Sequence, residues 1–278
     1  MKPIIATTDF TAASQNAVNY AADLATALGC KLILFHAVQL PVVVSDVPMP
    51  EPFYEEMLKS ANQDLKEMRE KLAMRNKGKL EIEIEILPGS VSHELHEICD
   101  QRKPFAVVMG RGAGRSFEQL IIGSETFYAI KHLNYPILVV PESASFKGIK
   151  KIGLACDLEA EEGSLPFAQL KELLLAFNPT LDVIHILPKE KALESGQVAE
   201  SMSLQNHLNV FRPNFHFLSK EKVDDGISEF AKQHELDLLV VFPRKHDFFG
   251  LFHKRVSKSV ILHHQLPVMT MRGGEGQN

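Results

Sequence analysis

The fold is decided by residues 2–38, which read KPIIATTDFTAASQNAVNYAADLATALGCKLILFHAV. Lys2–Thr7 is a short apolar run, Ala12–Leu28 places apolar residues at helical spacing, and Lys31–Val38 is a second apolar run. Gly29 follows the helical segment, at the position where glycine commonly ends a helix. A strand, a helix and a strand in this order predict a right-handed βαβ unit and a mainly parallel sheet.

The same alternation continues through the first half of the chain. Spacing and composition predict helices over Tyr54–Arg75, Val91–Gln101 and Ser124–Leu133, and strands over Leu80–Leu87, Phe105–Met109 and Ile137–Val140. The run Leu80–Leu87 alternates Leu or Ile with Glu, a pattern typical of a half-exposed strand. We therefore expect this strand at an edge of the sheet.

The pattern begins again in the second half. Four segments recur in the same order: Ile4–Asp9 as residues 152–157, His36 as His185, Phe105–Met109 as Leu238–Phe242, and Ile130–Pro136 as Ile261–Pro267. The offset shrinks from 148 to 131 residues between the first and the last of these matches, which indicates shorter loops in the second copy. We predict a tandem duplication with domains at 1–141 and 151–272, a linker at 142–150 and a disordered tail at 273–278.

Composition limits the classes of function. The chain has 278 residues, 45% of them hydrophobic, and a net charge of −5, which is typical of a globular protein large enough for two domains. A pI of about 6.2 argues against a dedicated nucleic-acid binder. Cys30, Cys99 and Cys156 lie far apart with no CxxC spacing, so neither a disulfide framework nor a zinc ribbon is expected. Without a signal-like or membrane-spanning segment, we expect a cytoplasmic protein that contacts neither membrane nor nucleic acid.

The strongest chemical signal is the glycine-rich stretch VVMGRGAG at 107–114, which continues to Gly123 and Ser124. A strand that runs into glycines and then a helix can bind an anion, because backbone N–H groups then approach phosphate oxygens. The stretch is not a Walker A loop, since no Gly-Lys-Ser/Thr follows. It comes after the fourth strand, and in an open parallel sheet the first and fourth strands can border one cleft. A mobile surface loop is the alternative interpretation.

These motifs together resemble the universal stress protein family in its tandem form. The resemblance rests on TTDFT at 7–11, LFHA at 34–37, PGSV at 88–91, VMG at 108–110, Gly123-Ser124, and YPILVV at 135–140. It implies an α/β fold of two tandem Rossmann-like (adenine nucleotide alpha hydrolase-like) domains. Each would hold a five-stranded, mostly parallel sheet with helices on both faces. In ATP-binding members the loop reads G-x2-G-x9-G-S/T, and here Ala113 occupies the second glycine position.

The resemblance also implies a binding site for ATP, with Mg²⁺, in the first domain. It places the nucleotide among Thr8, Asp9, Ala37, Met109, Gly110, Arg111, Gly112, Ala113, Gly123, Ser124 and Glu125. Asp9 would bind the ribose, backbone groups of Ala37 the adenine, and residues 110–113 the phosphates. From the residues alone, Asp9 also fits a helix N-cap or a turn residue before Ala12.

The second copy differs where a ligand would bind. Its loop begins with Pro243 in place of glycine, and Lys254 stands at the position of Gly123. We therefore expect no ATP site in the second domain, and we expect Phe248, Phe249 and Phe252 to fill the vacated cleft. The alternative is that they form an apolar patch for a partner or a membrane. The basic residues of 244–258 form either a solvated face or a site for an anion or an acidic partner.

Protomers of this family pair through their last strands. The resemblance therefore implies that Ile137–Val140 and Val268–Met271 pair within this chain as an internal pseudo-dimer. It also implies that two chains can form a homodimer. We predict a stress-response protein in which an adenine nucleotide acts as a conformational or partner-binding signal. A nucleotide-free interaction protein and a slow ATPase are the alternatives. No catalytic residue and no metal site is assigned, and the protein partner is unknown.

Overall fold

A computed structural model of the chain describes residues 1–39, 51–112, 123–156, 165–187, 195–220, 223–242 and 265–272. The strands in the first half are β1 (Ile4–Thr7), β2 (Leu32–Val38), β3 (Ile82–Pro88), β4 (Ala106–Arg111) and β5 (Ile137–Pro141). The helices there are α1 (Ala12–Leu28), α2 (Glu51–Arg75), α3 (Val91–Arg102) and α4 (Ser124–His132).

The second half holds β6 (Lys151–Ala155), β7 (Thr180–Leu187), β8 (Asn214–Ser219), β9 (Leu238–Val241) and β10 (Val268–Thr270). Its helices are α5 (Phe167–Phe177), α6 (Ser195–Leu208) and α7 (Val223–Gln233), with a 3-10 turn at Asn209–Phe211. Among the residues described above, no helix is both long enough and apolar enough to cross a membrane.

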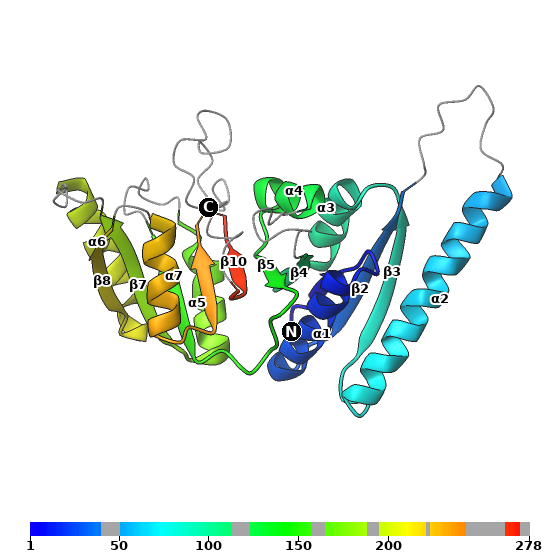
Figure 1. Cartoon of the computed structure of the whole chain (residues 1–278), viewed down its shortest axis with the longest axis horizontal. Helices are drawn as coiled ribbons and strands as arrows, with labels where there is room; N and C mark the ends of the chain where they lie inside the picture. Colours follow the sequence, from blue (N-terminus) through cyan, green and yellow to red (C-terminus); the bar gives the residue numbers. More distant parts are fainter. Residues whose placement is uncertain are drawn as a thin grey trace, which may run out of the picture.

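One ten-stranded sheet runs through the molecule in the order β3-β2-β1-β4-β5-β10-β9-β6-β7-β8. It consists of two five-stranded halves with the same internal order, and neighbouring strands within each half are parallel. The halves meet at β5 and β10, which lie side by side at the centre of the molecule (Figure 1) and pair antiparallel, Val139 opposite Val268 and Leu138 opposite Met269. This confirms the α/β fold and the pairing of the last strands that the sequence predicted.

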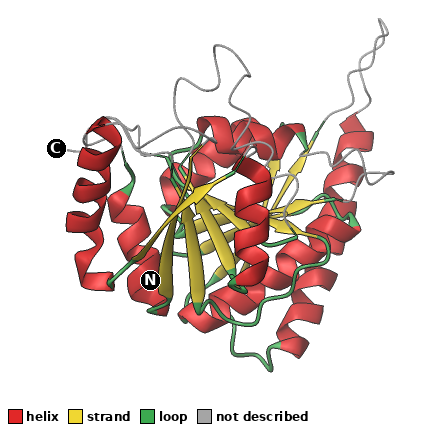
Figure 2. Ribbon diagram, turned by 60° about the vertical axis from the view of Figure 1, so that its left-hand side comes forward, coloured by secondary structure: helices red, strands yellow, loops and turns green. Residues whose placement is uncertain are grey.

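Helices cover both faces of the sheet (Figure 2). Buried residues of α1, α2, α5 and α6 belong to one apolar cluster, and those of α3, α4 and α7 belong to the cluster on the opposite face. In β1, Ile4 and Ala6 pack in the first cluster and Ile5 in the second, as expected for a strand whose alternate side chains point to opposite faces. Each cluster extends across both halves of the sheet.

Local sequence signals account for the ends of α1 and for the position of β3. The side chain of Thr11 caps α1, and Gly29 ends it in the left-handed conformation at φ 63°. The alternating strand β3 lies at the edge of the sheet, and its residues up to Leu87 are half-buried, as predicted. Predictions for residues 113–122, 243–264 and 273–278 lie outside the described residues.

An equivalent hydrogen bond occurs within each half. In the first half, Nδ1 of His36 lies 2.7 Å from the carbonyl oxygen of Thr8, directly after β1. In the second half, Nδ1 of His185 lies 2.9 Å from the carbonyl oxygen of Cys156, directly after β6. The two histidines that match in the sequence therefore join the corresponding pairs of strands in the same way.

Candidate functional site

The turn after β1 is held by a network of short polar side chains. Oδ1 of Asp9 accepts hydrogen bonds from the backbone N–H of Thr11 at 3.1 Å and from its hydroxyl at 2.6 Å. Thr11 in turn caps α1 by accepting from the N–H of Ser14. Asp9 is thus the turn residue, and Thr11 is the N-cap. The second carboxylate oxygen of Asp9 takes part in none of these bonds.

The surroundings of Asp9 favour its charged form. Partial burial raises the pKa of its carboxyl, but the hydrogen bonds from Thr11 and Ser14 lower it by more, and the net pKa lies below the ordinary value. Asp9 therefore carries a full negative charge at neutral pH and acts only as a hydrogen-bond acceptor.

Phe10 adopts an unusual backbone conformation beside Asp9. Its φ is +64°, a region that non-glycine residues rarely enter. Thr8 and Gln15 hold it there, since Oγ1 of Thr8 accepts from the Phe10 N–H at 3.0 Å and Nε2 of Gln15 donates to the Phe10 carbonyl at 2.7 Å. The Phe10 ring lies 4.7 Å from the ring of His36. Backbone strain of this kind is often found at binding sites.

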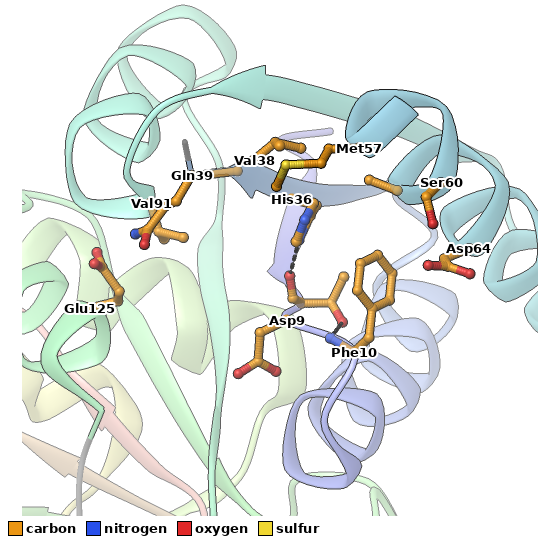
Figure 3. Close-up of a pocket in the computed structure, with 13 residues that line it drawn as sticks. Asp9, Phe10, His36, Val38, Gln39, Met57, Ser60, Asp64, Val91 and Glu125 are labelled. Atoms are coloured by element: carbon orange, nitrogen blue, oxygen red, sulfur yellow. Dashed lines mark hydrogen bonds between the residues drawn. The ribbon is translucent and has the colours of Figure 1, made fainter. Parts of the chain in front are cut away.

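These residues border a cavity of about 490 Å³ at the carboxyl ends of β1 and β2, a volume suited to a small-molecule ligand. Its walls come from the turn after β1, the end of β2, one face of α2 and the first turns of α3 and α4. They comprise Thr8, Asp9, Phe10, His36, Ala37, Val38, Gln39, Met57, Ser60, Ala61, Asp64, Val91 and Glu125. Figure 3 shows Glu125 at one side, the α2 residues at the other, and Asp9 and His36 between them.

Among the described residues, the charged side chains of this lining are all acidic. Asp9, Asp64 and Glu125 contribute carboxylates, and the described part of the lining holds no Lys or Arg. Oε2 of Glu125 is buried and accepts no hydrogen bond from the part of the chain that the structure describes. Because carboxylates repel phosphate and accept hydrogen bonds, this cavity suits a ligand part that carries donors, such as a nucleoside.

The glycine-rich stretch lies beside the cavity, at the end of β4. Gly110 is in close contact with the start of α1: a Cβ placed on it would lie 2.6 Å from the carbonyl oxygen of Ala13. Packing alone thus requires glycine at position 110. Around Gly123, by contrast, no heavy atom of the described residues lies within 4 Å of a Cβ built there. It precedes α4 and is exposed, like Ser124.

The structure brings together only part of the predicted site. Thr8, Asp9, Ala37 and Glu125 line the cavity. Met109 is buried in the apolar core, and Arg111 is buried with a pKa that burial lowers. Gly112 lies near Ala13, and Ala113 is outside the described residues.

Sequence reasoning missed several parts of the lining: Phe10 and His36, Val38 and Gln39 at the end of β2, Val91 at the start of α3, and the face of α2. Phe10 and His36 stand inside the quoted motifs TTDFT and LFHA, so their position was available as a signal. The α2 residues carried no such signal, because a polar helix can cover any part of a surface.

The fold and the cavity define an α/β protein with the Rossmann-like strand order 3-2-1-4-5 in its first half. A model of the universal stress protein family matches residues 1–141, and the chain belongs to this family. No curated protein sequence matches the chain.

Solved structures of the family have the same fold. A universal stress protein from Archaeoglobus fulgidus is similar over 98% of both chains, with a TM-score of 0.76 and 15% identity. A Pseudomonas aeruginosa structure assigned to the family covers 98% of this chain and 94% of its own, with a TM-score of 0.61 and 12% identity. A universal stress protein in complex with cAMP covers 51% of this chain and 98% of its own, with 22% identity and a TM-score of 0.38, too weak a similarity to transfer its ligand.

Proposed function

We propose that this universal stress protein binds one adenine nucleotide per chain, in the cavity between β1, β2, α2 and α4. The observation that carries the proposal is the cavity of about 490 Å³ at the carboxyl ends of β1 and β2. This is the place where open parallel sheets bind ligands. Family membership supports the same function.

The arrangement of charges supports an orientation for the nucleotide. The carboxylates of Asp9 and Asp64 suit the hydroxyl and amino donors of a nucleoside. The phosphates would lie outside this acidic lining, over the N-terminus of α4 at Gly123 and Ser124, where backbone N–H groups are available. Mg²⁺ would offset the repulsion between the phosphates and the carboxylate of Glu125.

We further propose that binding serves as a signal and that turnover is not the function. The nucleotide would join α2 to the ends of β1 and β2, and so couple occupancy to the position of an outer helix. The site would belong to the first of two domains, 1–141, joined through 142–150 to a second domain at 151–272 without such a site.

Calorimetry of the full chain with ATP, ADP and AMP tests the proposal. Gly123→Val is an informative variant, because the space around Gly123 leaves the fold unaffected apart from a capping cost of about 1 kcal/mol. We expect binding near one nucleotide per chain in the wild type and at least about tenfold weaker ATP binding in the variant. Circular dichroism of both proteins checks that each is folded.

Three results would count against parts of this proposal. Absence of binding by the wild type for all three nucleotides overturns it and favours a nucleotide-free interaction protein. A stoichiometry near two contradicts the single site. Steady release of phosphate from ATP that is lost in Gly123→Val and Asp9→Asn would make the protein an ATPase.

A further inference from the structure

The side of helix α2 that faces the sheet is apolar along one part of the helix and partly polar along the other. In its C-terminal half, Leu65 and Leu72 are buried in the core. From the middle of the helix toward its N-terminus, Met57, Ser60 and Asp64 line the cavity. Their spacing of three, four and seven residues puts them on one helix face. Ser60 and Asp64 thus face an open cavity, whereas the following turns of the helix face the core.

The order of the lining residues indicates which part of a nucleotide meets this face. Glu125, on α4, marks the side where the phosphates would lie; Asp9 follows at β1, and His36 follows at β2. The α2 residues lie beyond His36, on the side away from Glu125 (Figure 3). A nucleotide that lies along the strand ends therefore places its base between His36 and α2. This step rests on the proposed function.

Two side chains at this end, Asp64 and His36, are hydrogen-bond acceptors, while the hydroxyl of Ser60 can both donate and accept. The carboxylate of Asp64 lines the cavity and is exposed, and it can only accept hydrogen bonds. Nδ1 of His36 must carry the proton, because its partner at 2.7 Å is the carbonyl oxygen of Thr8. In the neutral ring, Nε2 is then an acceptor as well.

We propose that Asp64 and His36 read the base by accepting hydrogen bonds from the exocyclic amino group of a 6-aminopurine. An amino group offers two N–H donors, and this end of the cavity offers two acceptors from different elements. A purine without the amino group leaves both acceptors without a donor. The α2 face of the cavity is accordingly a specificity determinant for adenine.

The test compares AMP with purine riboside 5′-monophosphate, which has hydrogen in place of the amino group. Calorimetry on the full chain should show the deaminated nucleotide binding at least about tenfold more weakly than AMP to the wild type. In Asp64→Ala the ratio of the affinity for AMP to that for the deaminated nucleotide should fall toward one. The lost negative charge acts equally on both nucleotides, so the ratio isolates the hydrogen bond.

Glu70→Ala is the matched control. Glu70 is an exposed carboxylate on the same helix and is not part of the cavity lining, so the ratio should stay at its wild-type value. Equal affinities of the wild type for the two nucleotides would overturn the inference and leave the proposed function standing. So would an unchanged ratio in Asp64→Ala, or an equal loss in Glu70→Ala. If the wild type bound neither nucleotide, the proposed function and this inference would both fail.

Discussion

A glycine in this protein can be required by packing or by a ligand, and Gly110 and Gly123 illustrate the two cases. Gly110 is required because a Cβ would lie 2.6 Å from the Ala13 carbonyl oxygen and 2.8 Å from the Ser14 nitrogen. Gly123 has no such contact. The same family motif therefore contains one glycine explained by packing and one that is left for a ligand to explain.

Gly110→Ala should therefore destabilise the fold. Backbone of α1 must move to admit the methyl group, and we expect a loss of about 1–3 kcal/mol in the free energy of unfolding, measured with urea. Gly123→Ala, the control, should change it by no more than about 0.5–1 kcal/mol. Equal stabilities of the two variants would contradict the packing explanation. If Gly110→Ala is destabilised as expected, weak nucleotide binding by this variant does not identify a phosphate contact.

The thiol of Cys99 should make the fold sensitive to alkaline pH. Burial, with a smaller effect from Asp100, raises its pKa from 9.0 to about 12. The unfolded thiol ionises near pH 9 while the folded thiol stays protonated, so stability is lost as the pH rises from about 9 toward 12. One such group changes the free energy of unfolding by up to about 1.4 kcal/mol per pH unit.

Cys99→Ala tests this titration. Between pH 9 and 10.5 the stability of the variant should fall by about 1–2 kcal/mol less than that of the wild type. Urea unfolding at the two pH values gives this difference, and the cavity left by the substitution cancels from it. Parallel losses in both proteins would show that other groups cause the alkaline sensitivity.

At the scale of elements, the sequence predicted regular segments better than their tertiary roles. Helical spacing and a terminal glycine gave the bounds of α1, and alternation gave the edge position of β3. Both signals are local. That α2 lines a cavity with Asp64 depends on how the helix lies over β2, and the positive φ of Phe10 depends on the bonds around it. Neither is encoded in a short pattern.

The segment 142–150, predicted as a linker, lies against α1. Nδ2 of Asn16 donates to the carbonyl oxygens of Pro141 and Ala144, both at 2.9 Å. The ring of Phe146 packs edge-on against Tyr20 at 5.3 Å, and Ile149 is buried. The connection between the halves is thus fixed by side chains of the first helix.

Asn16→Ala should loosen this connection. Two partly buried hydrogen bonds are lost, although the Pro141 carbonyl oxygen still accepts from the N–H of Ala144, and we expect the free energy of unfolding to fall by about 1–2 kcal/mol. Asn62→Ala, at an exposed position on α2, is the control and should be neutral or slightly stabilising. Limited proteolysis should also cut near 142–150 faster in Asn16→Ala. Unchanged stability and cleavage would mean that the segment is held by its apolar contacts alone.

For the whole molecule, the central question is whether the two halves unfold as one. The β5–β10 pairing is the only strand pairing that joins the two halves of the described sheet, and its residues Leu138, Val139, Val268 and Met269 are at most 1% exposed. The apolar cluster on each face continues across this pairing. A sheet edge buried to this degree is costly to expose, because its apolar side chains and backbone groups lose their partners.

Met269→Ala should therefore destabilise both halves together. Truncating this buried side chain is expected to cost about 2–5 kcal/mol. Scanning calorimetry should show a single transition in the wild type and a single transition at lower temperature in the variant. Met202→Ala is the control, because Met202 is 61% exposed and its truncation should shift the transition little. Two resolved transitions, of which Met269→Ala moved only one, would show that the halves unfold independently despite their common sheet.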